Sequence, residues 1–244
     1  MTDAHCHVTG GDTSVRELLI GRDFFGVHPW EIAEIGPEDV RRKTEDLASR
    51  FVSSAASPLP NPVGIGEIGL DRLKEKSISP LMRSVFETQL KLAAELHCPV
   101  VLHGAKCWGE VIATVRRILS SGPQSSNPPI PQSSNSPSIP AFLFHGFSRS
   151  DGLLPDIVAL NGFVSVGPAV LNDHAVNYRE LVKKIPLERL LLETDRTPEN
   201  AATCPSVFAV AAKVAELRGL SLDELERLTD RNATAFQQTS PNFS

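Results

Sequence analysis

Imidazole and carboxylate side chains stand at the ends of five short apolar runs in this sequence. These residues are His5, His7, Glu67, His103, His145 and Asp195. Nitrogen and oxygen donors of this kind bind Zn²⁺, Mn²⁺ or Mg²⁺, and six of them are enough for two ions that share a carboxylate. A single histidine in such a place is more often a hydrogen-bonded surface residue, but coincidence at five strand ends is much harder to obtain. The pattern therefore predicts a site for two divalent cations.

Short apolar runs alternate with amphipathic stretches along the chain, which is typical of an α/β protein with a parallel sheet. The seven runs expected to form strands are Thr2–Cys6, Phe24–His28, Pro62–Glu67, Pro99–His103, Ala141–His145, Gly162–Gly167 and Arg189–Glu193. In a TIM-type (β/α) barrel, the catalytic residues lie at the carboxyl ends of several strands. Such a barrel would bring the six side chains to one mouth, and it is the fold that we predict.

Three helices between and after these strands have recognisable starts. One is expected after Ser79-Pro80, a second over Val207–Arg218 with Ser206 as its cap, and a third after the capping-box sequence that begins at Ser221. The segment 120–140 is rich in Ser, Pro, Asn and Gln and has too little apolar surface to offset its ordering entropy. We therefore expect one domain over residues 1–244, with a flexible loop insertion at 120–140.

The composition of the 244 residues is that of an ordinary globular protein, with 41% hydrophobic residues and a formal net charge of −5. A protein that holds nucleic acid mainly by charge usually has a basic patch, so a nucleic-acid substrate would need bound metal ions for much of the positive charge. The four cysteines are scattered without CxxC spacing, and no apolar run is long enough to cross a membrane. We expect a cytoplasmic protein with free thiols, no membrane contact and no obligate protein partner.

Several longer motifs make the sequence similar to a known family. They are Asp3-Ala4-His5-Cys6-His7, Gly26-Val27-His28-Pro29-Trp30, Gly66-Glu67-Ile68-Gly69-Leu70-Asp71, Leu102-His103, Phe144-His145-Gly146-Phe147-Ser148 and Leu192-Glu193-Thr194-Asp195. Their types and order resemble the TatD-type metal-dependent deoxyribonucleases and hydrolases. The resemblance covers nearly the whole chain outside the Ser/Pro insertion, and it implies that the six residues of the predicted metal site bind divalent metals.

This resemblance and the chemistry of the residues lead to hypotheses about individual roles. The expected reaction is hydrolysis of a phosphodiester in DNA or in a smaller nucleotide-like substrate by a metal-activated water. Glu67 is expected to bridge two ions, and Asp195 to bind metal and receive the proton of the water. Asp3 would hold one of the histidine ligands in its tautomer from behind. Lys106 and Arg149 are candidates for phosphate contact, and His28 either lines the pocket mouth or stabilises the turn before Pro29.

The sequence departs from the common family pattern in four places, one of which is Arg196-Thr197 after Asp195, where a small residue and proline are common. Only 20 residues lie between His7 and His28, where longer members place an additional βα unit, so the barrel is expected to be distorted or seven-stranded. Lys106 stands near the position of a usual arginine. Trp30 stands where many relatives have a second histidine. The metal chemistry should survive these changes, whereas the substrate preference is open.

Two other functions remain open at this stage. The same ligands could hydrolyse an ester or amide, including an aminoacyl ester on RNA, because fold does not determine the bond that is cleaved. A binding protein on a degenerate barrel is the alternative without catalysis, and the intact set of six ligands argues against it. Trp108 is expected in the core, and Cys6 is expected to point away from the ligands into packing.

Overall fold

The computed structural model describes residues 1–52, 62–74, 76–120, 140–148 and 151–238. The strands are β1 (Thr2–Cys6), β2 (Arg16–Leu19), β3 (Phe24–Phe25), β4 (Gly64–Asp71), β5 (Val100–Ala105), β6 (Phe142–Phe144), β7 (Gly162–Val166) and β8 (Leu190–Leu192). The α-helices are α1 (Pro29–Glu34), α2 (Pro37–Val52), α3 (Pro80–Leu96), α4 (Trp108–Ser120), α5 (Leu154–Ala159), α6 (Val176–Lys184), α7 (Val207–Arg218) and α8 (Leu222–Gln237). Short 3₁₀ turns are η2 (Asp151–Leu153), η3 (Pro168–Leu171) and η4 (Leu187–Arg189). Most of the expected insertion at 120–140 lies outside the described residues.

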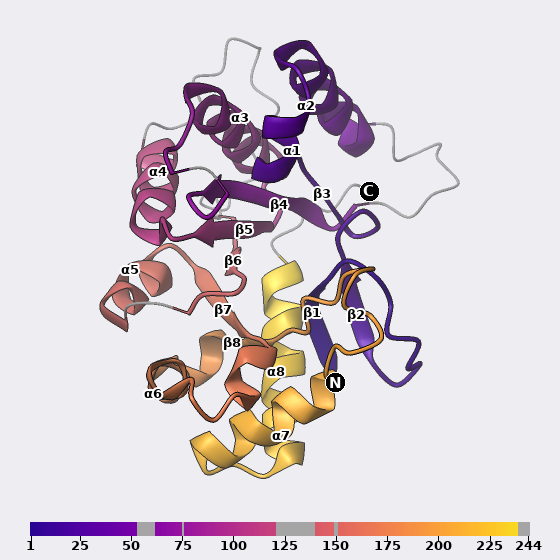
Figure 1. The fold of residues 1–244 in the computed structure, drawn as a ribbon, viewed down its shortest axis with the longest axis vertical. Helices are drawn as coiled ribbons and strands as arrows, with labels where there is room; N and C mark the ends of the chain where they lie inside the picture. Colours follow the sequence, from indigo (N-terminus) through magenta and orange to yellow (C-terminus); the bar gives the residue numbers. More distant parts are fainter. Residues whose placement is uncertain (53–61, 75, 121–139, 149–150, 239–244) are drawn as a thin grey trace, which may run out of the picture.

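The strands follow one another in chain order around a barrel (Figure 1). β3 to β8 form a six-stranded sheet in which every pair is parallel, and β1 pairs in parallel with β2. A bridge between Ile20 and Phe24 joins β2 to β3. The amide of Asp195, just beyond β8, donates to the carbonyl of His5 on β1 at 3.0 Å. The predicted (β/α) barrel is therefore confirmed.

The expected distortion lies in the first third of the barrel. The described residues form eight strands rather than seven, because residues 16–19 form β2, which the hydrophobic pattern did not reveal. Of its four residues, Arg16 is exposed and only Leu18 and Leu19 are buried. Residues 7–15 and 20–23, which precede and follow β2 as short connections, contain no helix. The segment between His7 and His28 thus contains β2 and β3 and no helix.

The barrel interior has an apolar floor and a polar mouth. Inward-facing residues of the middle strands, Val101, Leu143, Phe163 and Leu191, pack into one buried cluster with Phe24. Phe236 of α8 closes this floor, with its ring centroid 5.8 Å from that of Phe24. Because side chains alternate along a strand, residues two positions further on also face inward. This position is His103 on β5 and Ser165 on β7. Just after β8 it is Glu193, and Asp195 follows two residues later.

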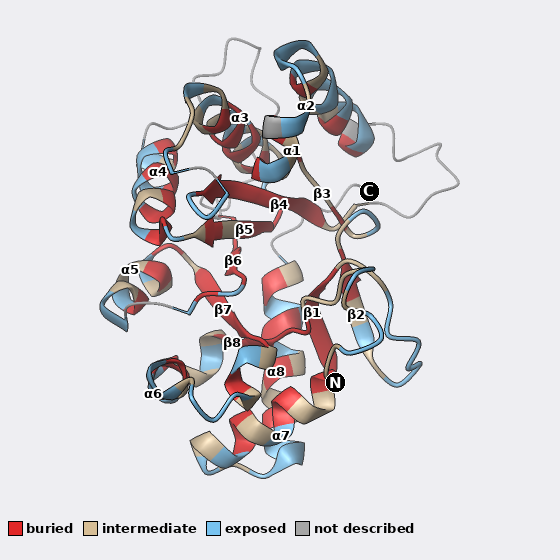
Figure 2. Cartoon of the chain, viewed as in Figure 1, coloured by how far each residue is buried: buried red, intermediate tan, exposed pale blue. Residues whose placement is uncertain are grey.

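Helices cover the outer face of the strands. Their buried residues pack against the strands, and their other sides are exposed (Figure 2). All three helix starts predicted from the sequence are confirmed. Ser79 accepts a hydrogen bond from the amide of Met82 at 3.1 Å, and Ser206 accepts one from Ala209 at 3.3 Å. Ser221 forms the expected capping box at the start of α8. In the part of the chain that is described, no helix has the length and apolarity needed to span a bilayer.

Candidate metal centre

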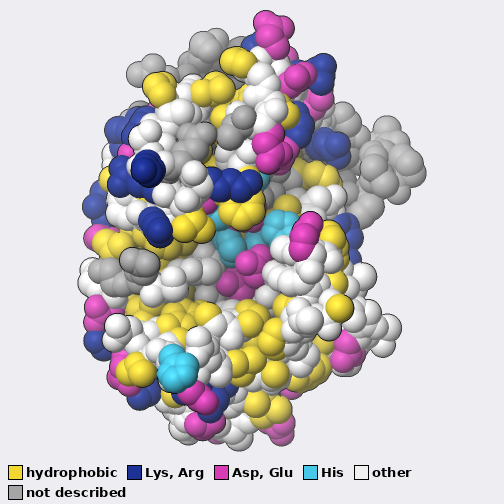
Figure 3. Space-filling model, in the orientation of Figure 1, with side chains coloured by type: hydrophobic (Ala, Val, Ile, Leu, Met, Phe, Trp, Pro, Cys, Tyr) yellow, Lys and Arg dark blue, Asp and Glu magenta, His cyan; other side chains and the backbone are white. Residues whose placement is uncertain are grey.

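The strand ends converge on a hollow in the face shown in Figure 3, where histidine and acidic side chains gather. All six residues predicted to bind metal lie there, and they come from β1, β4, β5 and the segments after β1, β6 and β8. His5 is fully buried, and the side chains of Glu67 and His145 are 3% and 9% exposed. Asp195 is the open member, with 48% of its side chain exposed. A buried carboxylate thus lies at the centre and a solvent-facing one at the edge.

Glu67 places its two carboxylate oxygens between two groups of imidazoles. Oε1 lies 2.7 Å from Nδ1 of His103 and 2.7 Å from Nε2 of His145. Nε2 of His28 is 3.3 Å from the same oxygen. Burial by itself would raise the pKa of Glu67, but the imidazole of His145 and hydrogen bonds from these three histidines hold it well below its usual range. Glu67 is therefore an anion at neutral pH.

The second oxygen of Glu67 faces the other group. Oε2 lies 3.5 Å from Nε2 of His5 and 3.5 Å from Nε2 of His7. Oδ1 of Asp195 is 3.5 Å from the same atom of His5 and 3.6 Å from that of His7. Burial would raise the pKa of Asp195, but the nearby imidazoles of His5 and His145 lower it. Two imidazole nitrogens therefore face two ionised carboxylates at distances longer than a good hydrogen bond.

Unsatisfied nitrogen atoms show that this cluster fits a divalent cation. Both ring nitrogens of His5 and Nδ1 of His145 are buried without a hydrogen-bond partner in the described structure. Burying a polar group without a partner costs about 1–3 kcal/mol, so such groups require an explanation. Within each of three groups, the donor atoms lie within 4.8 Å of one another. These groups are His5, His145 and Asp195; His5, His7 and Glu67; and His28, Glu67 and His103. Imidazole and carboxylate donors in this mix suit Zn²⁺ or Mn²⁺.

Asp71 is a site residue that the sequence reasoning missed. Its Oδ2 lies 2.8 Å from Nε2 of His103 and accepts a hydrogen bond from the indole Nε1 of Trp30 at 2.8 Å. Its Oδ1 accepts from the amides of Leu73 and Lys74, at 2.5 and 2.9 Å. The sequence signal was the even spacing of residues 67 and 71, which places both side chains on one face of a strand that continues to Asp71. Asp71 holds the His103 ring so that Nδ1 points at Glu67.

Glu193 has a similar position behind His145. Its Oε2 accepts a hydrogen bond from the hydroxyl of Ser165 at 2.5 Å and lies 3.6 Å from Nδ1 of His145. Its Oε1 accepts from the amide of Gly146 at 2.8 Å. The side chain is 2% exposed, so this carboxylate lies behind the cluster and away from solvent. Glu193 and Asp195 are two residues apart at the end of β8, so strand alternation predicts that both side chains face the barrel interior.

The hydrogen bonds of Asp3 differ from those expected. The side chain does not contact a histidine ring: Oδ1 accepts from the amides of Thr194 and His5, at 3.0 and 3.4 Å, and Oδ2 accepts from the hydroxyl of Thr194 at 2.6 Å. The reason is depth, because Asp3 lies two residues below His5 on the same face of β1. Burial raises the pKa of Asp3 to about 7. Asp3 joins β1 to the end of β8 instead of orienting a ligand.

The predicted substrate contacts have different outcomes. His28 stabilises the turn before Pro29, because its Nδ1 accepts from the amide of Trp30 at 3.1 Å and caps α1; its Nε2 lies 3.3 Å from Oε1 of Glu67. Lys106 is exposed just after β5 and forms no ion pair with any residue that the structure describes. Arg149 lies outside the described residues. Trp108 is buried against Phe144 and Phe147, as predicted.

Cys6 also lies where the strand alternation predicts. It is fully buried, and its thiol contacts the carbonyl of Leu18 on β2 at 3.8 Å.

A cavity of about 430 Å³ adjoins the cluster on the side of β7 and β8. Its lining includes Glu193, Asp195 and Tyr178, together with Asn200 and Pro205 from the segment that precedes α7. This volume falls in the range of about 300–1,000 Å³ that is typical of small-molecule sites. The metal cluster therefore borders a space in which part of a substrate fits.

Comparisons with known proteins agree with this geometry. The family model described as TatD related DNase matches residues 21–238. YabD of Bacillus subtilis, described as an uncharacterized metal-dependent hydrolase, is 28% identical over 232 residues, which cover 91% of this chain and 80% of that protein. The 3'-5' ssDNA/RNA exonuclease TatD of Klebsiella pneumoniae is 29% identical over 215 residues, with 83% and 74% covered.

A solved structure shares the fold. The crystal structure of the TatD homolog YJJV from Escherichia coli K12 superposes with a TM-score of 0.65, at 23% identity, and the match covers 93% of this chain and 78% of that one.

Proposed function

Because this chain belongs to the TatD-related DNase family, we propose that it is a divalent-metal-dependent hydrolase that cleaves phosphodiester bonds in DNA or in a small phosphodiester substrate. The observation that carries the proposal is the place of Glu67, whose two oxygens face two separate groups of imidazoles. A carboxylate in that position is suited to be shared by two ions. We therefore propose two divalent ions per chain, of zinc, manganese or magnesium.

The residues divide between the two ions according to the oxygen of Glu67 that they face. His5, His7 and Asp195 would hold one ion together with Oε2. His103 and His145 would hold the other together with Oε1, with His28 beside them. When bound, such ions polarise a phosphoryl group and lower the pKa of water to near neutrality.

The chain's own residues supply the proton acceptor. Glu67 and Glu193 are buried to 3% and 2% exposure, whereas the Asp195 side chain is 48% exposed and lines the cavity. Its lowered pKa keeps it ionised near neutral pH, the form that can take a proton. We therefore propose that Asp195 accepts the proton of the attacking water, and that Glu67 stays a fixed anion that holds the histidines in place.

The surroundings favour a substrate held at one place rather than along a duplex. The net charge of −5 gives no general attraction for nucleic acid, and the cavity beside Asp195 is of small-molecule size. Lys106, exposed beyond β5, is the proposed phosphate contact on the opposite side of the mouth. The exonuclease relative acts on single-stranded DNA and RNA, and we propose a single-stranded end or a small phosphodiester for this chain.

A substrate panel tests this proposal. Purified protein, supplied in turn with Mg²⁺, Mn²⁺ and Zn²⁺, is assayed on a single-stranded oligonucleotide, a small phosphodiester, an aminoacyl ester and an amide. We expect metal-dependent cleavage of the two phosphodiesters. Cleavage of the aminoacyl ester or the amide alone would replace the nuclease function by an ester or amide hydrolase on the same centre. Binding without any hydrolysis would favour a binding protein.

A further inference from the structure

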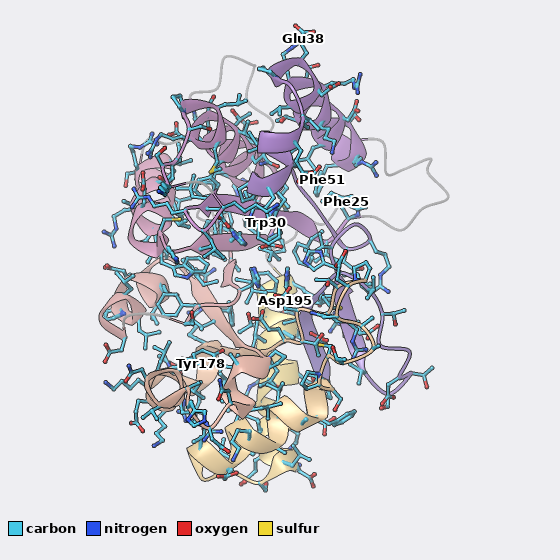
Figure 4. The ribbon with its side chains drawn as sticks, in the orientation of Figure 1. Phe25, Trp30, Glu38, Phe51, Tyr178 and Asp195 are labelled. Carbon is cyan, nitrogen blue, oxygen red and sulfur yellow. The ribbon has the colours of Figure 1, made fainter. Side chains whose placement is uncertain are left out.

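Trp30 is an exposed aromatic residue at the edge of the metal centre. Its side chain lies on the β4 and β5 side of the mouth, and Asp195 lies across from it (Figure 4). The residue is 38% exposed, although its indole N–H is bound to Asp71. The indole ring centroid is 5.0 Å from that of His28 and 6.0 Å from that of His103, with interplanar angles of 82° and 73°. Both imidazoles are thus nearly perpendicular to the indole, and part of the indole is open to solvent.

A cationic side chain lies over this indole. The ammonium of Lys74 lies 4.3 Å from the ring centroid, within cation–π range. Lys74 is 49% exposed, and its ion pair with Glu34 is long, at 3.7 Å. Arg72 lies at the end of β4 and shares Glu110 with Arg83, so one carboxylate faces two guanidinium groups. Glu34 and Glu110 balance part of this charge, and Lys74 is the cation that lies over the indole.

An indole with exposed surface beside a cationic side chain is an arrangement with which proteins bind single-stranded nucleic acid. Bases stack on the aromatic face, and the cations hold the backbone phosphates. The bond from Trp30 to Asp71 fixes the indole relative to His103, because Asp71 binds both side chains through Oδ2. A base on this indole therefore has a defined distance from a phosphodiester at the metal centre.

We propose that Trp30 is the stacking platform for a nucleobase of the substrate and that Lys74 holds the adjoining phosphate. This inference rests on the proposed nuclease function and names the residues that select a single strand with unstacked bases. When a base occupies the ring, the Lys74 ammonium moves from the indole to the phosphate. Its weak pairing with Glu34 permits this movement. The bases of a duplex are already stacked on one another, so they have no free face to place on the indole.

Binding measurements can separate stacking from charge. A thymidylate hexamer and an abasic hexamer with the same phosphates are titrated into the protein in EDTA, which prevents metal-dependent cleavage. Tryptophan emission reports the contact, because the only other tryptophan, Trp108, is buried in the core. We expect saturable quenching by the thymidylate hexamer alone. Affinities of the wild type and all variants for both hexamers are measured by the anisotropy of a fluorophore on the hexamer, because the Trp30 variants lack the reporting indole. Trp30→Ala should weaken binding of that hexamer by roughly 5- to 100-fold and leave the abasic hexamer unaffected.

Two variants separate stacking from the hydrogen bond to Asp71. Trp30→Phe keeps an aromatic face and loses the indole N–H, so it should bind the thymidylate hexamer within about threefold of the wild type. Lys74→Gln should weaken both hexamers and reduce the salt dependence of binding by about one phosphate contact. Leu222→Ala is the matched control, because Leu222 is 39% exposed and lies at the start of α8. It should change neither affinity.

The results distinguish this inference from the proposed function. Equal losses in Trp30→Ala and Trp30→Phe, or equal binding of the two hexamers by the wild type, would overturn the stacking role. Wild-type cleavage of the same hexamers is measured separately with Mg²⁺, Mn²⁺ or Zn²⁺. A wild type that cleaves neither hexamer overturns the nuclease function, while base-dependent quenching would still support the platform.

Discussion

Replacing Gly104 by alanine should destabilise the barrel at the strand that carries His103. A Cβ at this position would lie within 2.6 Å of three ring carbons of Trp108: Cε3, Cδ2 and Cζ3. The indole cannot move aside easily, because it is buried and packs against Phe144 and Phe147 with centroid distances of 5.5 and 5.6 Å. Overpacking of a filled core costs about 1–3 kcal/mol. For a domain of this size, each kcal/mol lowers Tm by about 2–4 °C, so we expect a loss of about 2–12 °C.

Gly109→Ala is the matched control, five residues along the chain. A Cβ at Gly109 meets no atom within 4 Å, and the residue lies in the first turn of α4. Alanine should therefore stabilise the protein, by about 0.5 kcal/mol. Urea unfolding followed by circular dichroism measures both free energies, and the near-ultraviolet signal reports the Trp108 ring. If Gly104→Ala were as stable as Gly109→Ala, the packing of β5 against α4 described above would be incorrect.

Three further substitutions have defined outcomes. Asp71→Asn should lower metal affinity about 10- to 100-fold with the fold intact, because His103 loses its charged partner, as isothermal titration with Zn²⁺ would measure. Asp3→Asn should alter the pH dependence of apoprotein stability, because the pKa of Asp3 is raised to about 7 from 3.8. The wild type should lose on the order of 4 kcal/mol of unfolding free energy as pH rises from about 4 to 7 and the protonated carboxyl ionises. Urea midpoints of the variant should lack this decline. Ser221→Ala removes the cap of α8 and should cost about 1 kcal/mol in the same unfolding assay, with no effect on metal binding.

The metal centre was predictable from sequence because its residues end buried strands. Val101 and Leu143 belong to continuous apolar runs, and the histidines two residues beyond them interrupt those runs. In a parallel barrel such interruptions all fall at one mouth, so His103 and His145 needed no knowledge of distance to be placed together. The helix starts were predictable for a related reason, because Ser79, Ser206 and Ser221 act on amides three residues away.

Features that depend on strand length or depth were missed. The sequence indicated a strand that ends at Glu67, whereas it runs on to Asp71, so a second inward carboxylate was overlooked. β2 was missed because its pattern of four residues is too short to show a period. Asp3 was given to a histidine ring because alternation along a strand predicts the face of a side chain and not how deep it lies. The partner that it binds, Thr194, comes from the far end of the chain.

The central claim is that Glu67 would be shared by two ions, and metal content with DNA cleavage for the wild type and Glu67→Ala tests it most directly. Glu38→Ala, at an exposed position on α2 far from the mouth (Figure 4), serves as the matched control. We predict up to two divalent ions per chain and metal-dependent cleavage of single-stranded DNA in the wild type and in Glu38→Ala. Glu67→Ala should lose cleavage and bind less metal. A wild type that binds no divalent metal, or a Glu67→Ala variant that keeps its metal and its activity, would contradict the account.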